Sequence, residues 1–179
     1  MVKVMKKVSE NYVKNAEEAR KIFPGAVVMD VTLDGLMGKF DPGYRWGNVK
    51  VPGREKEEGL SLKGVMEGLK IFKRKGVDEK WWKDEKFLRK ERNCKSYGNL
   101  TGFDFGNESV NVEKGREIFE NIYKEEIEKR FGKVIEGLRK EERTVVLLDY
   151  KEGDERKVMN HAEILKEIIE KEEKESLAA

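Results

Sequence analysis

Two short apolar segments that are rich in β-branched residues limit the folds that this chain can adopt, and they lie far apart in the sequence. They are residues 26–32 (AVVMDVT) and 144–149 (TVVLLD), and each is typical of a buried strand. No stretch approaches the roughly 18 consecutive apolar residues of a transmembrane helix. We therefore expect a protein that does not span a membrane. Its buried strands should form a small sheet, and other elements must cover that sheet.

Helical spacing predicts the covering elements. In residues 61–76 the apolar side chains form one stripe at 3.6 residues per turn, ending before Gly76. That stripe contains Leu62, Val65, Met66, Leu69 and Phe72. Residues 112–138 predict one long helix or two that separate near Gly132, and residues 158–174 predict a last helix. The fold class is thus α+β, a small sheet covered by several helices in a single compact domain, 1–179.

The uneven distribution of glycine, proline and tryptophan divides this domain into two parts. Most of the 17 glycines, all 3 prolines and all 3 tryptophans lie between residues 24 and 106. We expect residues 25–110 to be loop-rich and to carry the site, and residues 111–175 to be a helical scaffold.

Composition excludes several classes of function. The chain has 38 basic and 36 acidic residues, a net charge of +2, so overall charge does not predict a protein that binds polyanions. One cysteine and one histidine exclude a cysteine zinc cluster, an intrachain disulfide and metal sites built on several histidines. The first residues lack the apolar core of a signal peptide. We expect a cytoplasmic protein with no metal, no cofactor and no membrane partner.

Each apolar segment contains one aspartate, Asp30 in the first and Asp149 in the second. Burial of a carboxylate costs several kcal/mol unless it is paired or hydrogen-bonded. Either each aspartate caps a turn at the end of its strand, or the strand ends deliver both carboxylates to a cleft. The second alternative makes Asp30 and Asp149 candidate catalytic residues.

The helix predicted at 61–76 also has a charged face, which contains Lys63, Glu67, Lys70 and Arg74. Beside it lie Gly64 and Gly68, and each glycine costs a helix about 1 kcal/mol relative to alanine. That cost indicates that a backbone or a ligand approaches closely there. The alternative is an ordinary ladder of ion pairs. We expect Lys63, Glu67 and Arg74 to lie outside the main core.

Two further features leave alternatives open. Residues 80–95 hold seven basic and three acidic residues interleaved with aromatics, a pattern that suits a phosphate backbone and stacked bases. The same pattern is typical of an amphipathic helix whose aromatics are core. His161 is either a structural histidine or the base for a nucleophile such as Cys94.

A series of short motifs, spread over about residues 25–165, resembles the NADAR superfamily, named for NAD and ADP-ribose. They are Asp-Val-Thr (30–32), Phe-x-Pro (40–42), Val-Pro-Gly (51–53), the helix 61–72, the glycine-containing loop 98–106, Leu-Leu-Asp-Tyr (147–150) and His-Ala (161–162). The resemblance implies an α+β, N-glycosidase-like hydrolase linked to riboflavin-pathway nucleotides and ADP-ribosylated guanine.

The resemblance also implies roles for individual residues. The family helix has a Glu, then a Gln four residues later and a Lys seven residues after the Glu. Here those positions are Lys63, Glu67 and Lys70, so only the last matches and the carboxylate comes one turn later. The resemblance then implies Glu67, with Asp30 or Asp149, as the working carboxylates. Remaining contacts to substrate are implied for Lys63 and Lys70 (phosphate), Trp46 (base stacking), and Asn99 and Asp104 (base edge).

The predicted function is therefore hydrolysis of an N-glycoside in a small-molecule nucleotide or ADP-ribosyl substrate. One alternative is a non-catalytic module that binds a nucleotide or nucleic acid, with weak nucleic-acid contact through residues 80–95. Another is a catalytically inactive interaction protein of the same fold.

Overall fold

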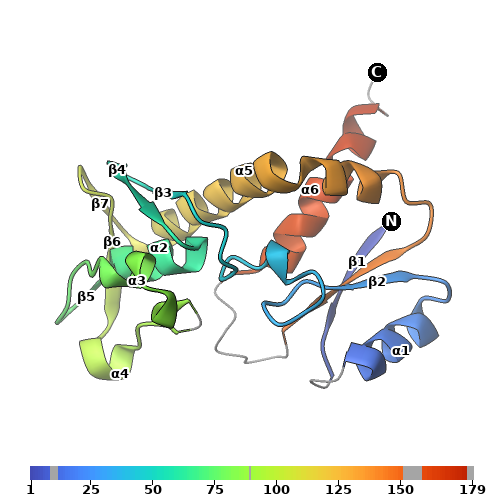
Figure 1. Cartoon of the computed structure of the whole chain (residues 1–179), viewed down its shortest axis with the longest axis horizontal. Helices are drawn as coiled ribbons and strands as arrows, with labels where there is room; N and C mark the ends of the chain where they lie inside the picture. The colour runs from blue at the N-terminus through green and yellow to red at the C-terminus, as the bar shows by residue number, and fades with distance from the viewer. Residues whose placement is uncertain (9–11, 89, 151–158, 177–179) are drawn as a thin grey trace. The chain divides into compact units, whose positions relative to one another are not determined.

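The computed structural model describes residues 1–8, 12–88, 90–150 and 159–176. Contacts divide the chain into two compact units. Unit 1 consists of Met1–Asp41 with Tyr123–Ala179, and unit 2 consists of Pro42–Ile122. The described residues form helices and three small sheets, so the predicted α+β class is confirmed (Figure 1). Whether both units fold together as the predicted single domain stays a prediction.

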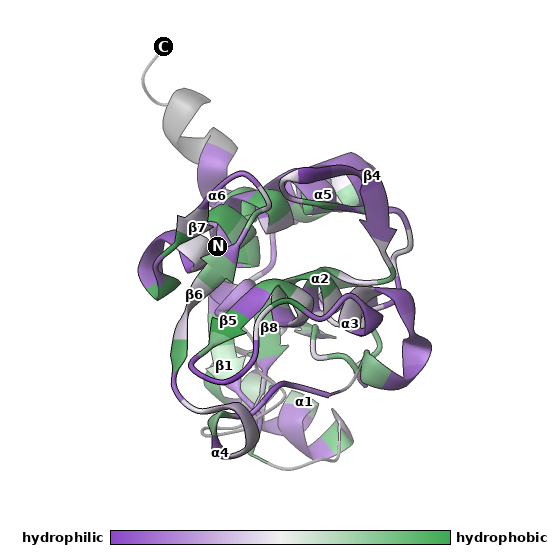
Figure 2. Cartoon of the chain, turned by 90° about the vertical axis from the view of Figure 1, so that its left-hand side faces the viewer, coloured by the Kyte–Doolittle hydropathy of each residue, from purple (hydrophilic) through white to green (hydrophobic). Residues whose placement is uncertain are grey.

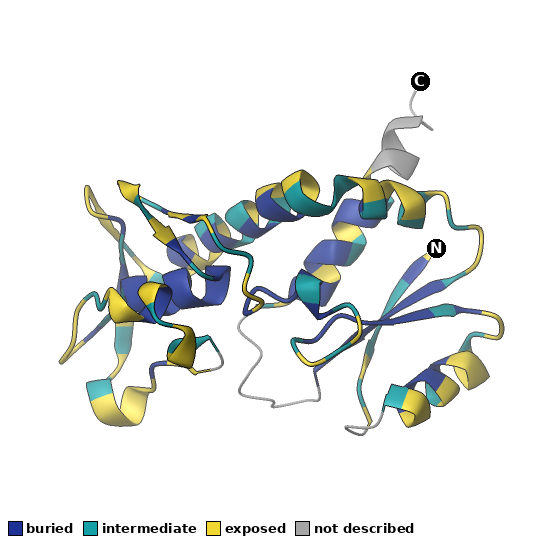
Figure 3. Ribbon diagram, viewed as in Figure 1, coloured by how far each residue is buried: buried dark blue, intermediate teal, exposed yellow. Residues whose placement is uncertain are grey.

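The sheet of unit 1 is parallel and has the order β1-β8-β2. Its strands are β1 (Val2–Lys6), β8 (Val145–Asp149) and β2 (Val27–Asp30). Both apolar segments thus form strands, as predicted, and β8 is the central one. Every residue of β8 is buried (Figure 3), because β8 has a strand on each side and packing on both faces.

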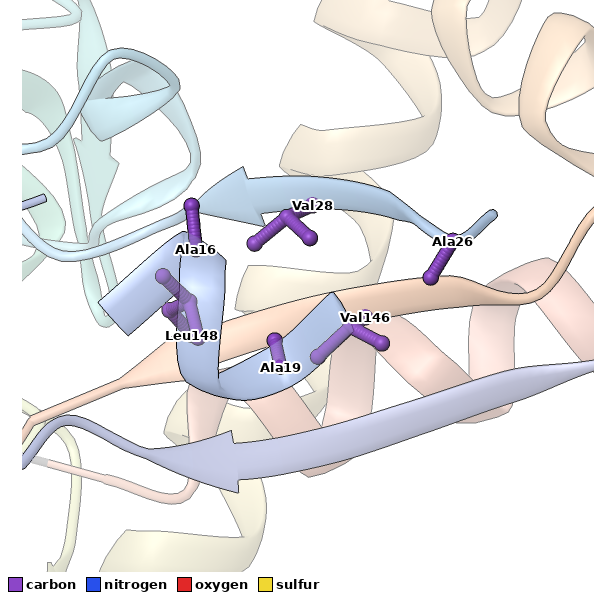
Figure 4. Packing of buried hydrophobic residues seen from close by; sticks show 6 residues of the cluster. All are labelled: Ala16, Ala19, Ala26, Val28, Val146 and Leu148. Carbon is purple, nitrogen blue, oxygen red and sulfur yellow. The ribbon is translucent and has the colours of Figure 1, made fainter. Parts of the chain in front are cut away.

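Helices cover both faces of this sheet. On one face, α1 (Tyr12–Ile22) packs Ala16 and Ala19 against the side chains of Val28, Val146 and Leu148 (Figure 4). Behind the sheet in that view lie α6 (His161–Ser176) and the later part of α5 (Val112–Arg139).

The two helices on the second face are joined by polar contacts. Arg139 donates a hydrogen bond of 2.9 Å to the carbonyl of Ile168, and Lys124 pairs with Glu167 at 3.1 Å. Phe131 has non-helical backbone angles, which divides α5 beside Gly132 as the sequence predicts. Val158, the predicted start of the last helix, lies outside the described residues.

Unit 2 holds short antiparallel sheets and short helices. Strands β3 (Val49–Val51) and β4 (Arg54–Gly59) form one pair. A second sheet is built from β5 (Lys70–Phe72), β6 (Leu100–Asp104) and β7 (Ser109–Val110). The helices are α2 (Leu62–Leu69), α3 (Lys80–Lys83) and α4 (Cys94–Tyr97). Short 3-10 turns occur at Gly38–Phe40 (η1, unit 1) and Glu85–Phe87 (η2, unit 2).

Helix α2 corrects two sequence expectations. It begins as predicted, with Ser61 accepting a hydrogen bond from the Gly64 N–H (3.0 Å), but it ends at Leu69 and continues as β5. Lys70 and Arg74 therefore leave the predicted helical face, and Phe72 is buried from a strand. All eight residues of α2 are buried. The expectation that Lys63 and Glu67 lie outside the core is wrong, because neighbouring segments cover every side of this helix; Arg74 is exposed as expected.

The two glycines of α2 make room for α3. A β-carbon on Gly68 would overlap the ring of Trp82, and one on Gly64 would lie 2.6 Å from the carbonyl oxygen of Trp81. Trp82 is fully buried. The close approach indicated by the sequence is therefore made by protein, at the Trp81–Trp82 segment, and these glycines need no ligand to explain them.

We expect Gly68→Ala to destabilise the protein by about 1–3 kcal/mol, because the added methyl group overpacks a site that cannot relax. Gly137→Ala in α5 is the matched control, since nothing lies within 4 Å of a β-carbon there. That control should be neutral or stabilising by up to about 1 kcal/mol, the helix preference for alanine. Urea unfolding of both variants measures the difference, and equal effects would contradict the packing of Trp82 on Gly68.

Candidate functional site

The carboxyl end of the parallel sheet in unit 1 is the place where the fold favours a ligand. In parallel sheets, ligands bind outside the carboxyl ends of neighbouring strands whose following helices go to opposite faces. Strand β1 is followed by α1 on one face, and β8 is followed by α6 on the other (Figure 4). The ends of β1 and β8 are adjacent, with Lys6 opposite Asp149 in the strand register. This edge carries several polar side chains, namely those of Lys6, Lys7, Asp30, Thr32, Asp149 and Tyr150.

Asp30 is held by a buried lysine and by its own turn. Its Oδ2 lies 3.0 Å from Lys7 Nζ, and both side chains are nearly inaccessible, at 4% and 8% exposure. Its Oδ1 accepts hydrogen bonds from the Thr32 hydroxyl (2.7 Å) and the Thr32 N–H (3.2 Å). Lys7 also donates to the Thr32 hydroxyl at 3.1 Å. Asp30 therefore does cap the turn after its strand, and it also forms a buried ion pair.

Asp149 is paired with the neighbouring lysine. Its side chain is fully buried, and Oδ2 contacts the ammonium group of Lys6, whose side chain is 42% exposed. Its backbone carbonyl accepts a hydrogen bond from the Lys7 N–H at 3.0 Å. Two consecutive lysines at the end of β1 thus form ion pairs with the two strand-end carboxylates. The Lys6 side chain reaches from the buried Asp149 carboxylate to solvent.

A third buried carboxylate, Asp41, lies in the same unit. Its Oδ2 accepts a hydrogen bond of 2.7 Å from the Tyr150 hydroxyl, which itself accepts one from the Leu33 N–H at 3.0 Å. Tyr123 donates to the carbonyl of Phe40 at 2.6 Å. Burial raises the pKa of Tyr123 well above its usual range, and the charges of Asp41 and Asp149 add to this. Tyr123 is therefore a neutral hydrogen-bond donor at physiological pH.

His161, the first residue of α6, is fully buried. Its Nε2 lies 3.1 Å from the carbonyl oxygen of Val31 and 3.9 Å from Asp41 Oδ2. Its Nδ1 has no hydrogen-bond partner among the described residues. These contacts support the structural reading of this histidine. Cys94, the nucleophile considered with it, belongs to unit 2 and is an exposed free thiol.

Glu67 is engaged by protein groups on both carboxylate oxygens. Oε1 accepts from Lys70 Nζ at 2.5 Å and Oε2 accepts from the Arg92 N–H at 2.8 Å, and the side chain is 1% exposed. These contacts tie the segment that contains Arg92 to the end of α2. The catalytic role implied for Glu67 stays a prediction, and the structure supplies a stabilising role for it.

Arg92 completes that arrangement. Its guanidinium donates to the carbonyls of Glu67 (3.2 Å), Lys70 (2.9 Å) and Gly76 (2.7 Å). Burial lowers its pKa from the ordinary value, and the negative charge of Asp78 opposes this shift. Arg92 thereby satisfies carbonyl groups that a helix end leaves without partners, so α2 can end in a buried place and continue as β5.

The predicted substrate contacts all belong to unit 2. Lys63 is buried and its backbone N–H donates to the Pro42 carbonyl at 2.8 Å. Trp46 is half-buried and Asn99 is exposed. Asp104 is half-buried and accepts a hydrogen bond of 2.7 Å from the Gly106 N–H, so it caps a turn. Asp30 and Asp149 end neighbouring strands of unit 1, on opposite faces of the sheet because Asp30 is opposite Leu148 in the register. Glu67 and Lys70 are paired in unit 2.

Sequence reasoning missed the other polar groups of the strand-end cluster: Lys6, Lys7, Thr32, Asp41 and Tyr150. One signal was available, because two consecutive lysines follow the alternating residues of β1. Asp41 carried no such signal, since its partner Tyr150 is distant in sequence.

The basic segment 80–95 buries its largest aromatics. Trp81 and Trp82 are buried, and Trp81 packs against Phe87 with ring centroids 4.6 Å apart. The two tryptophans are therefore core residues, as the second alternative expects, which removes them from base stacking. The expected single amphipathic helix is wrong, because the segment forms α3, η2 and the start of α4. Lys80, Lys86 and Lys90 lie over the ring of Phe87, and Arg89 lies outside the described residues.

Over the described part of the chain, no group of three or more His, Cys, Asp and Glu side chains is arranged to hold a metal ion. The described helices also include none that is both long enough and apolar enough to span a bilayer.

Comparison with known proteins gives one relationship. Residues 11–165 match the model of a family described as Family of unknown function (DUF6939). A search of the curated proteins found no match. The matched residues include β2, β8 and the start of α6, and so Asp30, Asp149 and His161. Because the match covers most of the sequence, this chain belongs to the DUF6939 family.

Proposed function

We propose that this chain hydrolyses the N-glycosidic bond of a nucleotide or ADP-ribosyl substrate, and that the reacting centre lies at the carboxyl end of β1, β8 and β2. The observation that carries the placement is the pair of buried carboxylates, Asp30 and Asp149, on adjacent parallel strands, each beside a lysine. The reaction class rests on the resemblance of the motifs to the NADAR superfamily.

The chemistry needs a negative charge beside the sugar. When the bond between C1′ and the base nitrogen breaks, its electron pair leaves with the base and C1′ becomes an oxocarbenium-like cation. Asp149 is assigned to stabilise that cation, because it is a buried carboxylate paired with Lys6, a group that reaches solvent. Water then adds to C1′ and loses a proton to a carboxylate. Nicotinamide leaves as a neutral molecule, whereas a purine leaves as an anion and takes up that proton to complete the hydrolysis.

The neighbouring groups have supporting roles in this scheme. Asp30, fixed by Lys7 and Thr32, is assigned to accept the proton of the attacking water. Lys6 is the one of the two lysines with substantial exposure, and its ammonium group suits a substrate phosphate. The lone, free cysteine fits a reducing compartment, so the proposed site of the reaction is the cytoplasm.

The test is release of a free base from a panel of N-glycosides, including nicotinamide and purine nucleotides and an ADP-ribosylated guanine, followed by chromatography. Asp149→Asn should lower turnover by at least about 100-fold, the scale for loss of a positioned charged group. Asp30→Asn should also lower turnover. Glu117→Gln, which removes an exposed carboxylate on α5, is the matched control and should turn over like wild type.

Glu67→Gln distinguishes the two placements of the centre. Loss of turnover in Glu67→Gln with normal turnover in Asp149→Asn would move the centre to unit 2. If the purified protein releases no base from any member of the panel, the proposed reaction is wrong. Circular dichroism of each variant separates loss of chemistry from loss of fold.

A further inference from the structure

A polar cavity lies within unit 2, beside the turn between β3 and β4. Its volume is about 530 Å³, and it is lined by Gly53, Arg54, Glu55, Lys56, Glu57 and Asn107. Strand β4, which supplies most of the lining, is strongly hydrophilic (purple in Figure 2). None of these residues belongs to the strand-end cluster of unit 1.

The wall of this cavity is built by a close contact between two turns. Gly53 and Gly106 both have left-handed backbone angles, with φ of 71° and 79°. A β-carbon on Gly53 would overlap the carbonyl group of Phe105, so only glycine allows this approach. The contact brings Asn107, which follows the second turn, to the edge of β4.

The Arg54 side chain lies against Trp82 and Glu57 at the cavity. Its guanidinium lies 6.0 Å from the ring centroid of Trp82, and Nη1 is 3.9 Å from Glu57 Oε1. Its side chain is 24% exposed. Nε is buried and has no acceptor among the described residues. Because Nε is closed off from solvent, the two Nη groups are the part of the guanidinium that can meet a ligand in the cavity.

Arg54 shares its neighbouring carboxylates, Glu57 and Glu79, with Lys83. Glu57 Oε2 already accepts from Trp82 Nε1 (3.3 Å) and pairs with Lys83 Nζ (3.3 Å). Lys56 makes no ion pair with any residue that the structure describes. Glu55, which also lines the cavity, is the one opposing charge that has no ion pair within the described residues.

We propose that this cavity is a second, separate ligand site, which binds a small oxyanion (a carboxylate or a phosphate) through the Arg54 guanidinium. The planar guanidinium presents parallel N–H groups that match the oxygens of such an anion. Lys56 adds positive charge and the Asn107 amide adds a neutral donor. The negative charge of Glu55 repels the anion and so limits the affinity of the cavity for it.

The experiment is an NMR titration of the full chain with inorganic phosphate, with acetate, and with chloride at matched ionic strength. We expect saturable shifts in the amide signals of Gly53–Glu57 and Asn107 with an oxyanion and not with chloride. If phosphate saturates the shifts and acetate does not, the ligand is a phosphate group; the reverse identifies a carboxylate. Binding is measured without turnover, so the result is independent of the proposed hydrolysis.

Three variants sharpen the test. Arg54→Gln should weaken binding at least about tenfold, as expected for loss of a charged hydrogen bond. Glu55→Gln should tighten binding, because it removes a negative charge that repels the anion. Arg116→Gln, which removes an exposed arginine of α5 outside the cavity, should bind like wild type.

Several outcomes would overturn the proposal. Shifts that grow without saturation and equally with chloride show only general ionic effects. Equal affinity in Arg54→Gln and wild type excludes Arg54 as the anchor. If Arg54→Gln does not fold, Arg54→Lys, which keeps the charge and loses the planar group, replaces it, and the comparison of oxyanions with chloride on the wild-type protein still decides.

Discussion

Replacing Lys7 with methionine should lower the free energy of unfolding of unit 1 by about 3–5 kcal/mol, the usual cost of removing one partner from a buried ion pair. Lys7 and Asp30 are both more than nine-tenths buried and lie 3.0 Å apart. Without the ammonium group, Asp30 keeps its hydrogen bonds from Thr32 but loses the charge that compensates its own. A methionine of similar length fills the space, so the loss is electrostatic and not a cavity effect.

This effect is measured by urea unfolding followed by circular dichroism. Amide hydrogen exchange of the β8 residues reports the local stability of the sheet. Lys14→Met, an exposed lysine on α1, is the control and should change stability by no more than about 0.5 kcal/mol. The double variant Lys7→Met, Asp30→Leu removes both charges and should recover part of the loss. A Lys7→Met protein as stable as the Lys14→Met control would mean that the pair at the sheet edge is not formed in solution.

Trp82→Ala should destabilise unit 2 by about 3–5 kcal/mol, the cost of truncating a large aromatic in a core. The Trp82 ring is fully buried against Gly68 of α2, its backbone carbonyl accepts a hydrogen bond from the Leu60 N–H at 2.9 Å, and its Nε1 donates to Glu57. The ring lies directly on Gly68, so its removal leaves a cavity beside α2.

Tryptophan fluorescence measures this effect in unit 2, because all three tryptophans of the chain lie between Pro42 and Ile122. Trp46→Ala makes the same change in volume at a half-buried position and should cost clearly less. If the Trp82→Ala loss were no larger than that of Trp46→Ala, Trp82 would not be the residue that joins α3 to α2.

Local pattern was sufficient for β2, β8 and the long helices. The β-branched runs became β2 and β8 because such residues find a buried, pleated environment in few other ways. The periodic apolar residues after position 112 became α5, and its irregular backbone lies at Phe131, next to the glycine that predicted a division. In each case neighbours in sequence carry the information, so a single sequence is enough to predict the element.

The strand-end cluster could be predicted only in part. Asp30 and Asp149 were recognisable because each is a charge inside an apolar run. The sequence did not show that Lys7 and Asp41 belong to this cluster. The position of Lys7 depends on the register of β1 with β8, and that of Asp41 depends on its hydrogen bond with Tyr150. No periodicity within one segment carries that information.

For this protein, the sequence by itself determined the α+β class, the two buried strands and the presence of buried carboxylates, because these follow from local hydrophobicity and from the cost of burying charge. Only the tertiary structure decided which cations meet those carboxylates, where α2 ends, and that Lys63 and Glu67 are buried. The reason is physical: Arg92 donates to the last carbonyls of α2, and the Trp81–Trp82 segment covers the two glycines of that helix. Such contacts exist only once the chain has folded.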